Sequence, residues 1–193
     1  MRQLSAPVAR ELLHTRQVRC TGYAREDGLW DIEATLSDAR TYDLDAVRAR
    51  GAHERAAGDP IHLMSLRLTV NDAFEIVGAE AVSHQVPYGD CENIGAAYGQ
   101  LVGLRIEAGF HREVKSRFRG PLGCTHLTEL LGPLATTALQ TIRPAQERRR
   151  QLRGEPLGDG PKPALLDSCH ALRRGGRAAI VRWGEVATTR EVS

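Results

Sequence analysis

The residues best suited to chemistry are two cysteines, Cys91 and Cys124, which stand where helices are expected to begin. A thiol at a helix N-terminus lies near unpaired backbone N–H groups and the positive end of the helix dipole, and both favour the thiolate. His62 and His126 could add imidazole nitrogen to this sulfur, which gives ligands suited to zinc or to an iron–sulfur cluster. The residues therefore predict a metal site formed by His62, Cys91, Cys124 and His126. The alternative for each cysteine is a buried position in the core, because free cysteine packs like a small hydrophobic residue.

The same region also has residues that an enzyme could use. His126 and Glu129 are three positions apart, so they share one face of the expected helix. An imidazole oriented by a carboxylate can act as a general base, and Tyr88 could donate a proton. The catalytic residues of such an enzyme would be His126, Tyr88 and Glu129. Arg67 could pair with the carboxylate of a small organic acid. In the alternative interpretation, Thr125 and Glu129 only cap and solvate the helix start.

Other candidate residues are less informative. Cys169 and His170 offer two more ligands, but they follow an expected flexible segment, and the three arginines at 148–150 are typical of a solvated stretch. Three aspartates near the expected hairpins are interpreted as residues that end strands: Asp31, Asp38 and Asp72. The sequence lacks the glycine-rich nucleotide-binding patterns, the HExxH motif and the GxSxG motif, which argues against nucleotide-binding folds, zinc proteases of that type and typical serine hydrolases.

The elements that must position these residues follow from the hydrophobic pattern. Alternation of apolar and polar residues predicts two β-hairpins, with strands at 17–23, 30–36, 62–70 and 74–82. Helical spacing predicts helices at 91–110, ended by Gly109, and at 125–142, with Pro133 inside. Shorter elements are expected as helices at 44–50 and 164–173 and as a last strand at 177–183. An antiparallel sheet of hairpins followed by packed helices is the α+β class.

Composition limits the kinds of partner. The 193 residues include 26 Lys+Arg and 24 Asp+Glu, and the resulting charge of +2 is too small to imply nucleic acid as a partner. No apolar run approaches the ~20 residues of a membrane helix, so no membrane partner is expected. Residues 1–13 lack the apolar centre of a signal peptide, which predicts a cytoplasmic protein. The basic residues are almost all arginine, a bias typical of a GC-rich bacterial genome.

The hydrophobic pattern of the expected strands and helices predicts a core domain at 1–145. An exposed linker rich in Arg, Gly and Pro follows at 146–163. Residues 164–193 form an extension that we expect to pack on the core.

Three groups of residues resemble a bacterial domain family of unknown function. They are the segment 25–33, Pro87-Tyr88 together with Cys91, and Gly123-Cys124-Thr125-His126-Leu127 together with Glu129. The resemblance extends from about residue 16 to Cys169-His170, and it implies no activity.

A second resemblance is more distant. Residues 59–138 look like the iron–sulfur cluster scaffold family, the NifU N-terminal or IscU-like domain. The strand pair at 64–76 is similar to the scaffold's, Cys91 stands at the family's second cysteine, and Cys124 opens its third cysteine motif. In that family, three cysteines with an aspartate or histidine hold zinc or a nascent cluster. Here Pro60-Ile61-His62 replaces the first cysteine, so the resemblance implies an IscU-like core at about 59–142 that holds zinc rather than a cluster.

These features together predict a divergent IscU-like metal-binding protein that acts as a binding or maturation factor. Its partner would be a small molecule or a metal-handling protein, and the sequence allows a homo-oligomer. The alternative is a lyase or hydrolase acting on an aromatic compound or an organic acid, without a cofactor or assisted by zinc. A third interpretation is a subunit whose helices dock on a partner.

Overall fold

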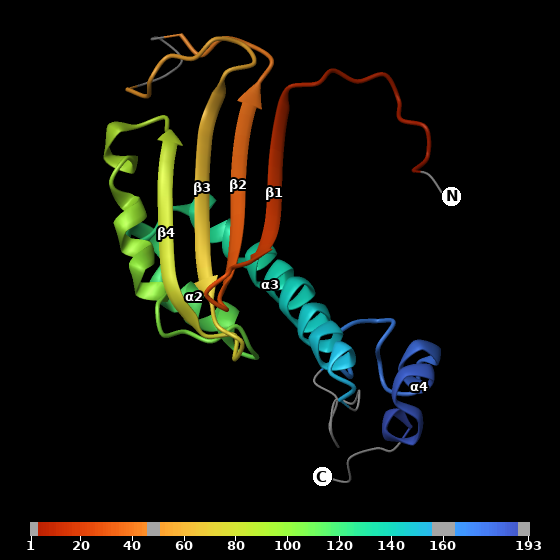
Figure 1. The fold of residues 1–193 in the computed structure, drawn as a ribbon. Helices are drawn as coiled ribbons and strands as arrows, with labels where there is room; N and C mark the ends of the chain where they lie inside the picture. Colours follow the sequence, from red (N-terminus) through yellow and green to blue (C-terminus); the bar gives the residue numbers. More distant parts are fainter. Residues whose placement is uncertain (1–3, 46–50, 156–164, 189–193) are drawn as a thin grey trace. The chain divides into compact units, whose positions relative to one another are not determined.

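The structure is a computed structural model that describes residues 4–45, 51–155 and 165–188. The chain divides into two compact units, residues 1–144 and 145–193. The first unit contains all the strands of the described residues and the helices next to them (Figure 1).

The sheet of the first unit is a four-stranded antiparallel meander with the order β1-β2-β3-β4. Its strands are β1 (His14–Ala24), β2 (Trp30–Arg40), β3 (Pro60–Val70) and β4 (Ile76–Gln85). The two predicted hairpins and the α+β class are thus confirmed. The main difference is length, because β1, β2 and β4 each extend beyond the residues at which the apolar alternation is clear.

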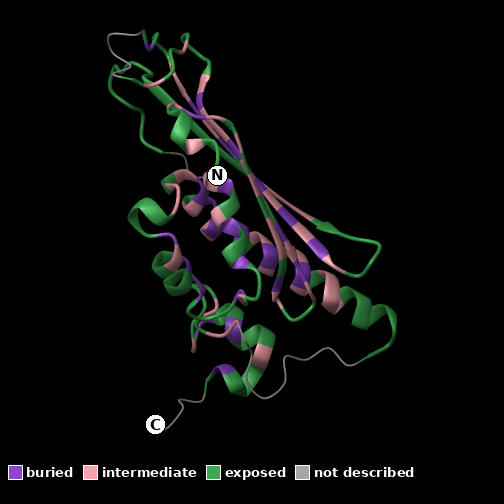
Figure 2. Cartoon of the chain, turned by 90° about the vertical axis from the view of Figure 1, so that its left-hand side faces the viewer, coloured by how far each residue is buried: buried purple, intermediate pink, exposed green. Residues whose placement is uncertain are grey.

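One face of this sheet forms the core. In β2 the side chains of Trp30, Ile32 and Leu36 are fully buried, whereas their neighbours along the strand are partly exposed. This face is covered by α2 (Phe110–Arg117), by the 3₁₀ segment η2 (Ile94–Leu101) and by the first part of α3 (Thr125–Leu152). Figure 2 shows buried residues on the sides of the strands and helices that face each other.

The first part of α3 follows β1 closely. Three pairs of residues meet along the two elements: Glu129 with Arg16, Thr137 with Cys20, and Thr141 with Gly22. Between the first and last of these contacts α3 advances about 18 Å and β1 about 20 Å, so the two elements run side by side in the same direction. A Cβ atom at Gly22 would lie 2.1 Å from Oγ1 of Thr141, which makes glycine necessary for this close approach.

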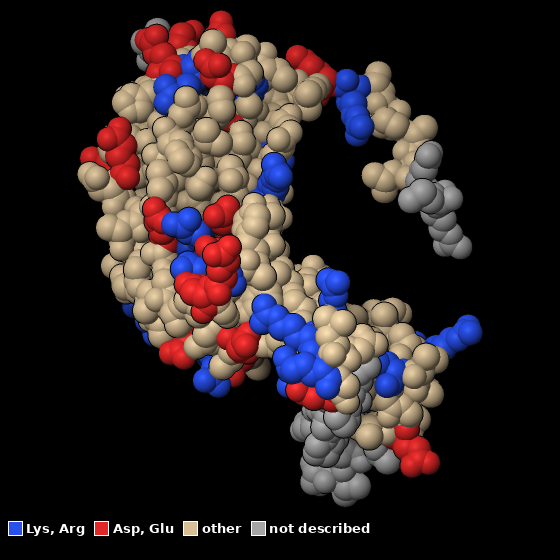
Figure 3. Space-filling model, in the orientation of Figure 1, with Lys and Arg blue, Asp and Glu red and all other residues tan. Residues whose placement is uncertain are grey.

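The opposite face of the sheet is polar and open. Figure 3 shows acidic and basic side chains intermingled on it. Arg67 is one of these residues, and it pairs with Glu33 at 3.7 Å and with Glu80. Arg67 was expected to bind a substrate beside the cysteines. Successive residues of a strand point to opposite faces, so Arg67 projects away from the buried face and this expectation is wrong.

The segment after β4 differs from the single helix predicted at 91–110. It contains the 3₁₀ segments η1 (Gly89–Cys91) and η2, and Gly109, with a φ of 96°, precedes α2 instead of ending a helix. The buried residues of η2 are Gly95, Tyr98 and Leu101. Their three-residue spacing is the period of a 3₁₀ helix, and the glycines of this segment lower its α-helix propensity.

The C-terminal half also departs from the predicted elements. α3 was expected to end at Ile142 but continues to Leu152, so part of the expected linker is helical. Residues 177–183 form the helix α4 (Arg177–Trp183) and not a strand; the segment is flanked by Gly176 and Gly184 and contains the helix-favouring pair Ala178-Ala179. Turns occupy 165–173 where a helix was predicted, and most of the helix predicted at 44–50 lies outside the described residues.

In the residues that the structure describes, no helix combines the length and the apolar character needed to cross a membrane.

Candidate metal centre

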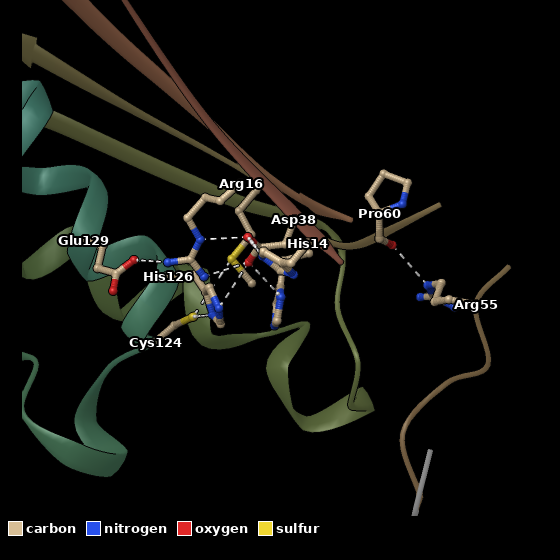
Figure 4. Close-up of polar contacts among 10 residues, drawn as sticks. His14, Arg16, Asp38, Arg55, Pro60, Cys124, His126 and Glu129 are labelled. Atoms are coloured by element: carbon tan, nitrogen blue, oxygen red, sulfur yellow. Dashed lines mark hydrogen bonds and ion pairs between the residues drawn. The ribbon is translucent and has the colours of Figure 1, made fainter. Parts of the chain in front are cut away.

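Three polar residues lie side by side across the buried face, at one end of the sheet. Strand pairing places Arg16 of β1 opposite Asp38 of β2, and Asp38 opposite His62 of β3. Residues directly opposite each other in an antiparallel pair project from the same face. Asp38 follows Leu36 at the strand's two-residue period, so all three point to the side of the core. α3 begins next to this row and brings His126 and Glu129 to it (Figure 4).

Asp38 is a buried carboxylate that Arg16 and His14 hold. Only 1% of the residue is exposed. Arg16 donates from Nε to Oδ1 at 2.7 Å and from Nη2 to Oδ2 at 2.8 Å, and Nε2 of His14 lies 3.2 Å from Oδ1. Burial favours the neutral acid, but the hydrogen bond from Arg16 and its positive charge outweigh burial and hold the pKa of Asp38 below its usual value. Asp38 is therefore ionised at neutral pH.

Two stacked imidazoles face this carboxylate. The rings of His62 and His126 have centroids 3.6 Å apart and an interplanar angle of 28°. Nδ1 of His62 lies 3.3 Å from Oδ2 of Asp38, and Nε2 of His126 lies 3.5 Å from the same oxygen. Burial lowers the pKa of His62 to about 4, helped by the neighbouring His126, and burial together with Arg16 lowers the pKa of His126. Both rings are neutral at pH 7, which is the state that binds metals.

The distances from Asp38 to the two histidines match those between ligands of one metal ion. Asp38, His62 and His126 each offer one ligand atom, and the three atoms all lie within 4.8 Å of one another. Around a tetrahedral zinc ion with bonds of about 2.0–2.1 Å, neighbouring ligand atoms are about 3.3–3.5 Å apart. Nδ1 of His62 is buried and, at 3.3 Å from Oδ2, still has no hydrogen-bond partner among the described residues. An ion bound here would satisfy this nitrogen.

Cys124 lies beside the imidazoles on the opposite side from Asp38. Its Sγ is 3.9 Å from Nδ1 of His126 and 3.9 Å from Sδ of Met64. The backbone of Cys124 is fixed by Tyr98, whose hydroxyl donates to the Cys124 carbonyl at 2.8 Å and accepts from its N–H at 3.0 Å. Tyr98 is fully buried and stacks on Phe118 with a centroid distance of 4.5 Å. The start of α3 is therefore held by a side chain from η2.

A cavity of about 350 Å³ opens beside these groups. Its walls include both imidazoles, Met64, Tyr88, Cys91 and Cys124. Burial, with a further contribution from nearby Cys124, raises the pKa of the Cys91 thiol. Cys91 lies at the end of η1 and not at the start of an α-helix, so the predicted activation of this thiol by a helix dipole is wrong.

The cavity brings together most of the residues singled out in the sequence. His62, Cys91, Cys124 and His126, the four predicted ligands, all line it, as does Tyr88. Glu129 does not orient His126; it accepts a hydrogen bond from Nη1 of Arg16 at 2.5 Å. Cys169 is exposed and belongs to the second unit.

The sequence did not identify Asp38 as a site residue. Asp38 is the carboxylate that faces His126, the role predicted for Glu129. Asp38 was interpreted as a residue that ends a strand, yet it lies within β2. The signal was present, because the inward-facing series Trp30, Ile32, Ala34 and Leu36 leads to Asp38 at the next step of two. A carboxylate in phase with core residues requires a partner, and Arg16 stands opposite it.

The first unit is thus an α+β domain with a His/Asp cluster under one end of its sheet. The family model described as "Protein of unknown function (DUF2889)" matches residues 14–140. The chain belongs to this family, which agrees with the resemblance to an uncharacterised domain family. No curated protein and no solved structure matches the chain.

Proposed function

We propose that this chain is a metal-binding protein whose ion is held by Asp38, His62 and His126, with zinc as the preferred ion. The observation that carries the proposal is the convergence of one carboxylate oxygen and two imidazole nitrogens within 4.8 Å. Carboxylate and imidazole are ligands that zinc accepts, and three protein ligands leave a fourth position for water or a small molecule.

The ionisation state of the cluster supports this function. Metal binding to histidine competes with protons, and here burial has already lowered the pKa of both imidazoles. Asp38 keeps its negative charge because Arg16 binds it. Arg16 donates once to each carboxylate oxygen, and His14 also contacts Oδ1. Oδ2, the oxygen that faces both imidazoles, therefore keeps a lone pair.

The charge of Arg16 does not by itself exclude a cation from the site. Arg16 also binds Glu129, so two carboxylates face one guanidinium. Arg16, Asp38 and Glu129 together carry one net negative charge, and the two imidazoles are neutral. A divalent ion would therefore meet an attractive site.

In the cell, such a protein would act as a binding or maturation factor that exchanges metal or a small molecule with a partner protein in the cytoplasm. The resemblance of residues 59–138 to the iron–sulfur scaffold family agrees with metal handling. The first cysteine of the scaffold family is replaced near His62 in this chain. Zinc therefore fits these residues better than an iron–sulfur cluster.

Elemental analysis of the protein purified without oxygen tests this function. We expect close to one zinc per chain in the wild type and a clear loss in His62→Ala. His84→Ala is the matched control, because His84 is an exposed histidine on β4 whose ring contacts the hydroxyl of Ser65. A folded wild type that contains no metal and binds none when zinc is added would reject the proposal.

The cavity supports a second candidate, an enzyme acting on a small aromatic compound or an organic acid. A volume of about 350 Å³ beside His126 and Tyr88 is suited to a small ligand. In this case His126 is the base, oriented by Asp38 instead of Glu129, and Tyr88 is the proton donor. A screen of small aromatic and carboxylic compounds should then give turnover that His126→Ala abolishes without unfolding the chain.

A further inference from the structure

The two nitrogens of His126 face two different sets of atoms. Nε2 faces the oxygen of Asp38 at 3.5 Å, whereas Nδ1 faces the sulfur of Cys124 at 3.9 Å. The thioether of Met64 lies 3.9 Å from the same Cys124 sulfur. We propose that Met64, Cys124 and Nδ1 of His126 form a second site, which binds a soft monovalent cation such as Cu(I).

The two distances from the Cys124 sulfur, to Met64 and to His126, fit donors around a single ion. With metal–sulfur bonds of about 2.3 Å, two sulfur ligands of one ion are about 3.8 Å apart in tetrahedral geometry and about 4.0 Å apart in trigonal geometry. The observed separation of the Cys124 and Met64 sulfurs is 3.9 Å. The sulfur–nitrogen separation of 3.9 Å needs only a small closure, because such ligands are about 3.6–3.8 Å apart around one ion.

The site is also accessible and well supported. Met64, Cys124 and His126 line the cavity of about 350 Å³, through which an ion could enter, and Cys91 lines the same cavity as a further thiol. Two of the three donors have fixed positions. Met64 is a fully buried residue of β3, and Tyr98 holds the backbone of Cys124 through two hydrogen bonds.

The donor types decide which ion this site prefers. Thiolate and thioether are soft ligands that select Cu(I), whereas the carboxylate of Asp38 suits harder divalent ions. Met64 is the informative residue, because a thioether adds little to a zinc site. The two sites use different nitrogens of His126 and otherwise different residues, so the inference does not rest on the zinc site of the proposed function. A neutral imidazole has one unprotonated nitrogen, and His126 therefore serves one of the two ions at a time.

The test is a Cu(I) titration of the reduced full chain without oxygen, in competition with a coloured Cu(I) chelator. We expect the wild type to take one Cu(I). Affinity should fall at least about tenfold in Met64→Leu and further in Cys124→Ser, as expected for the loss of a ligand. Cys20→Ser is the matched control, because Cys20 is a half-buried thiol of β1 beside Thr137 and does not line the cavity; its Cu(I) affinity should be unchanged.

Asp38→Asn separates the two sites, because it should weaken zinc binding and leave Cu(I) binding intact. A second readout identifies Met64 directly. The chain has two methionines, Met1 and Met64, so in selenomethionine-labelled protein a copper neighbour in the selenium X-ray absorption spectrum, absent in Met64→Leu, would confirm the ligand. Wild-type protein that binds no Cu(I), or Cu(I) binding that is equally tight in Met64→Leu without a copper–selenium signal, would overturn the inference.

Discussion

Arg16 binds both carboxylate oxygens of Asp38, with donor–acceptor distances of 2.7 and 2.8 Å, across two neighbouring strands. This pair gives a buried carboxylate its charge partner and fixes the orientation of the oxygen that faces both imidazoles. The third nitrogen of Arg16 reaches Glu129, so the same side chain joins β1, β2 and α3. The arrangement of the whole cluster thus depends on one arginine.

Replacing this arginine should destabilise the fold. In Arg16→Ala the carboxylate of Asp38 stays buried with only His14 and the two imidazoles near it, and breaking a fully buried pair costs several kcal/mol. Because the Arg16 side chain is 37% exposed, we expect a smaller loss of about 2 kcal/mol in the free energy of unfolding. Denaturant unfolding measures this free energy. Arg19→Ala, on the exposed side of β1, is the control and should change the free energy of unfolding by less than about 0.5 kcal/mol. Equal losses in both variants would contradict the role of Arg16.

The buried imidazoles predict a loss of stability in acid. Unfolded histidine titrates near 6.5, whereas the pKa of His62 is about 4 in the folded protein. Between these values the unfolded chain binds a proton that the folded site does not, so the free energy of unfolding falls as the pH decreases from about 6.5 towards 4. For His62 the loss is about 3 kcal/mol at most, and His126 adds to it in the same direction.

Unfolding of metal-free protein at pH 7 and at pH 4.5 measures this effect. His62→Gln should show a flatter dependence on pH than the wild type, and His84→Ala should follow the wild type. If the wild type and His62→Gln lost the same stability over this range, the lowered pKa of His62 would be wrong.

The hydroxyl of Tyr98 should matter for the position of Cys124. Tyr98→Phe keeps the ring that stacks on Phe118 but leaves the N–H and carbonyl of Cys124 without this partner. We expect a loss of about 1–3 kcal/mol in the free energy of unfolding, and weaker metal binding because the start of α3 is less well held. Tyr23→Phe, at an exposed position of β1, is the control. A Tyr98→Phe variant as stable as Tyr23→Phe would show that the hydroxyl does not anchor the helix.

The sequence predicted the elements whose hydrophobic period is simple. The alternation in β2 and β3 identified both hairpins, and the apolar spacing after Cys124 identified the start of α3. The segment between Cys91 and Phe110 was assigned the wrong helix type, because a three-residue period resembles the α-helical pattern over a short stretch.

The sequence predicted only those parts of the candidate site that depend on residue type and on position within one element. Residue type and helix position singled out His62, Cys124 and His126, which the fold does bring together. The register between strands was not predicted, and it is the register that places Asp38 between Arg16 and His62. The assignment of Glu129 as the partner of His126 used only neighbours within one helix, whereas Arg16 of β1 binds Glu129 more closely.

The central claim, a metal ion held by Asp38, His62 and His126, is tested most directly by calorimetric zinc titration of metal-free wild type and Asp38→Asn. The substitution keeps the size of the side chain and removes the charge that faces both nitrogens, and circular dichroism checks that the variant is folded. We predict one zinc per chain in the wild type and binding at least about tenfold weaker in Asp38→Asn. Equal zinc affinity in the two folded proteins, or no zinc binding by the wild type, would contradict the claim.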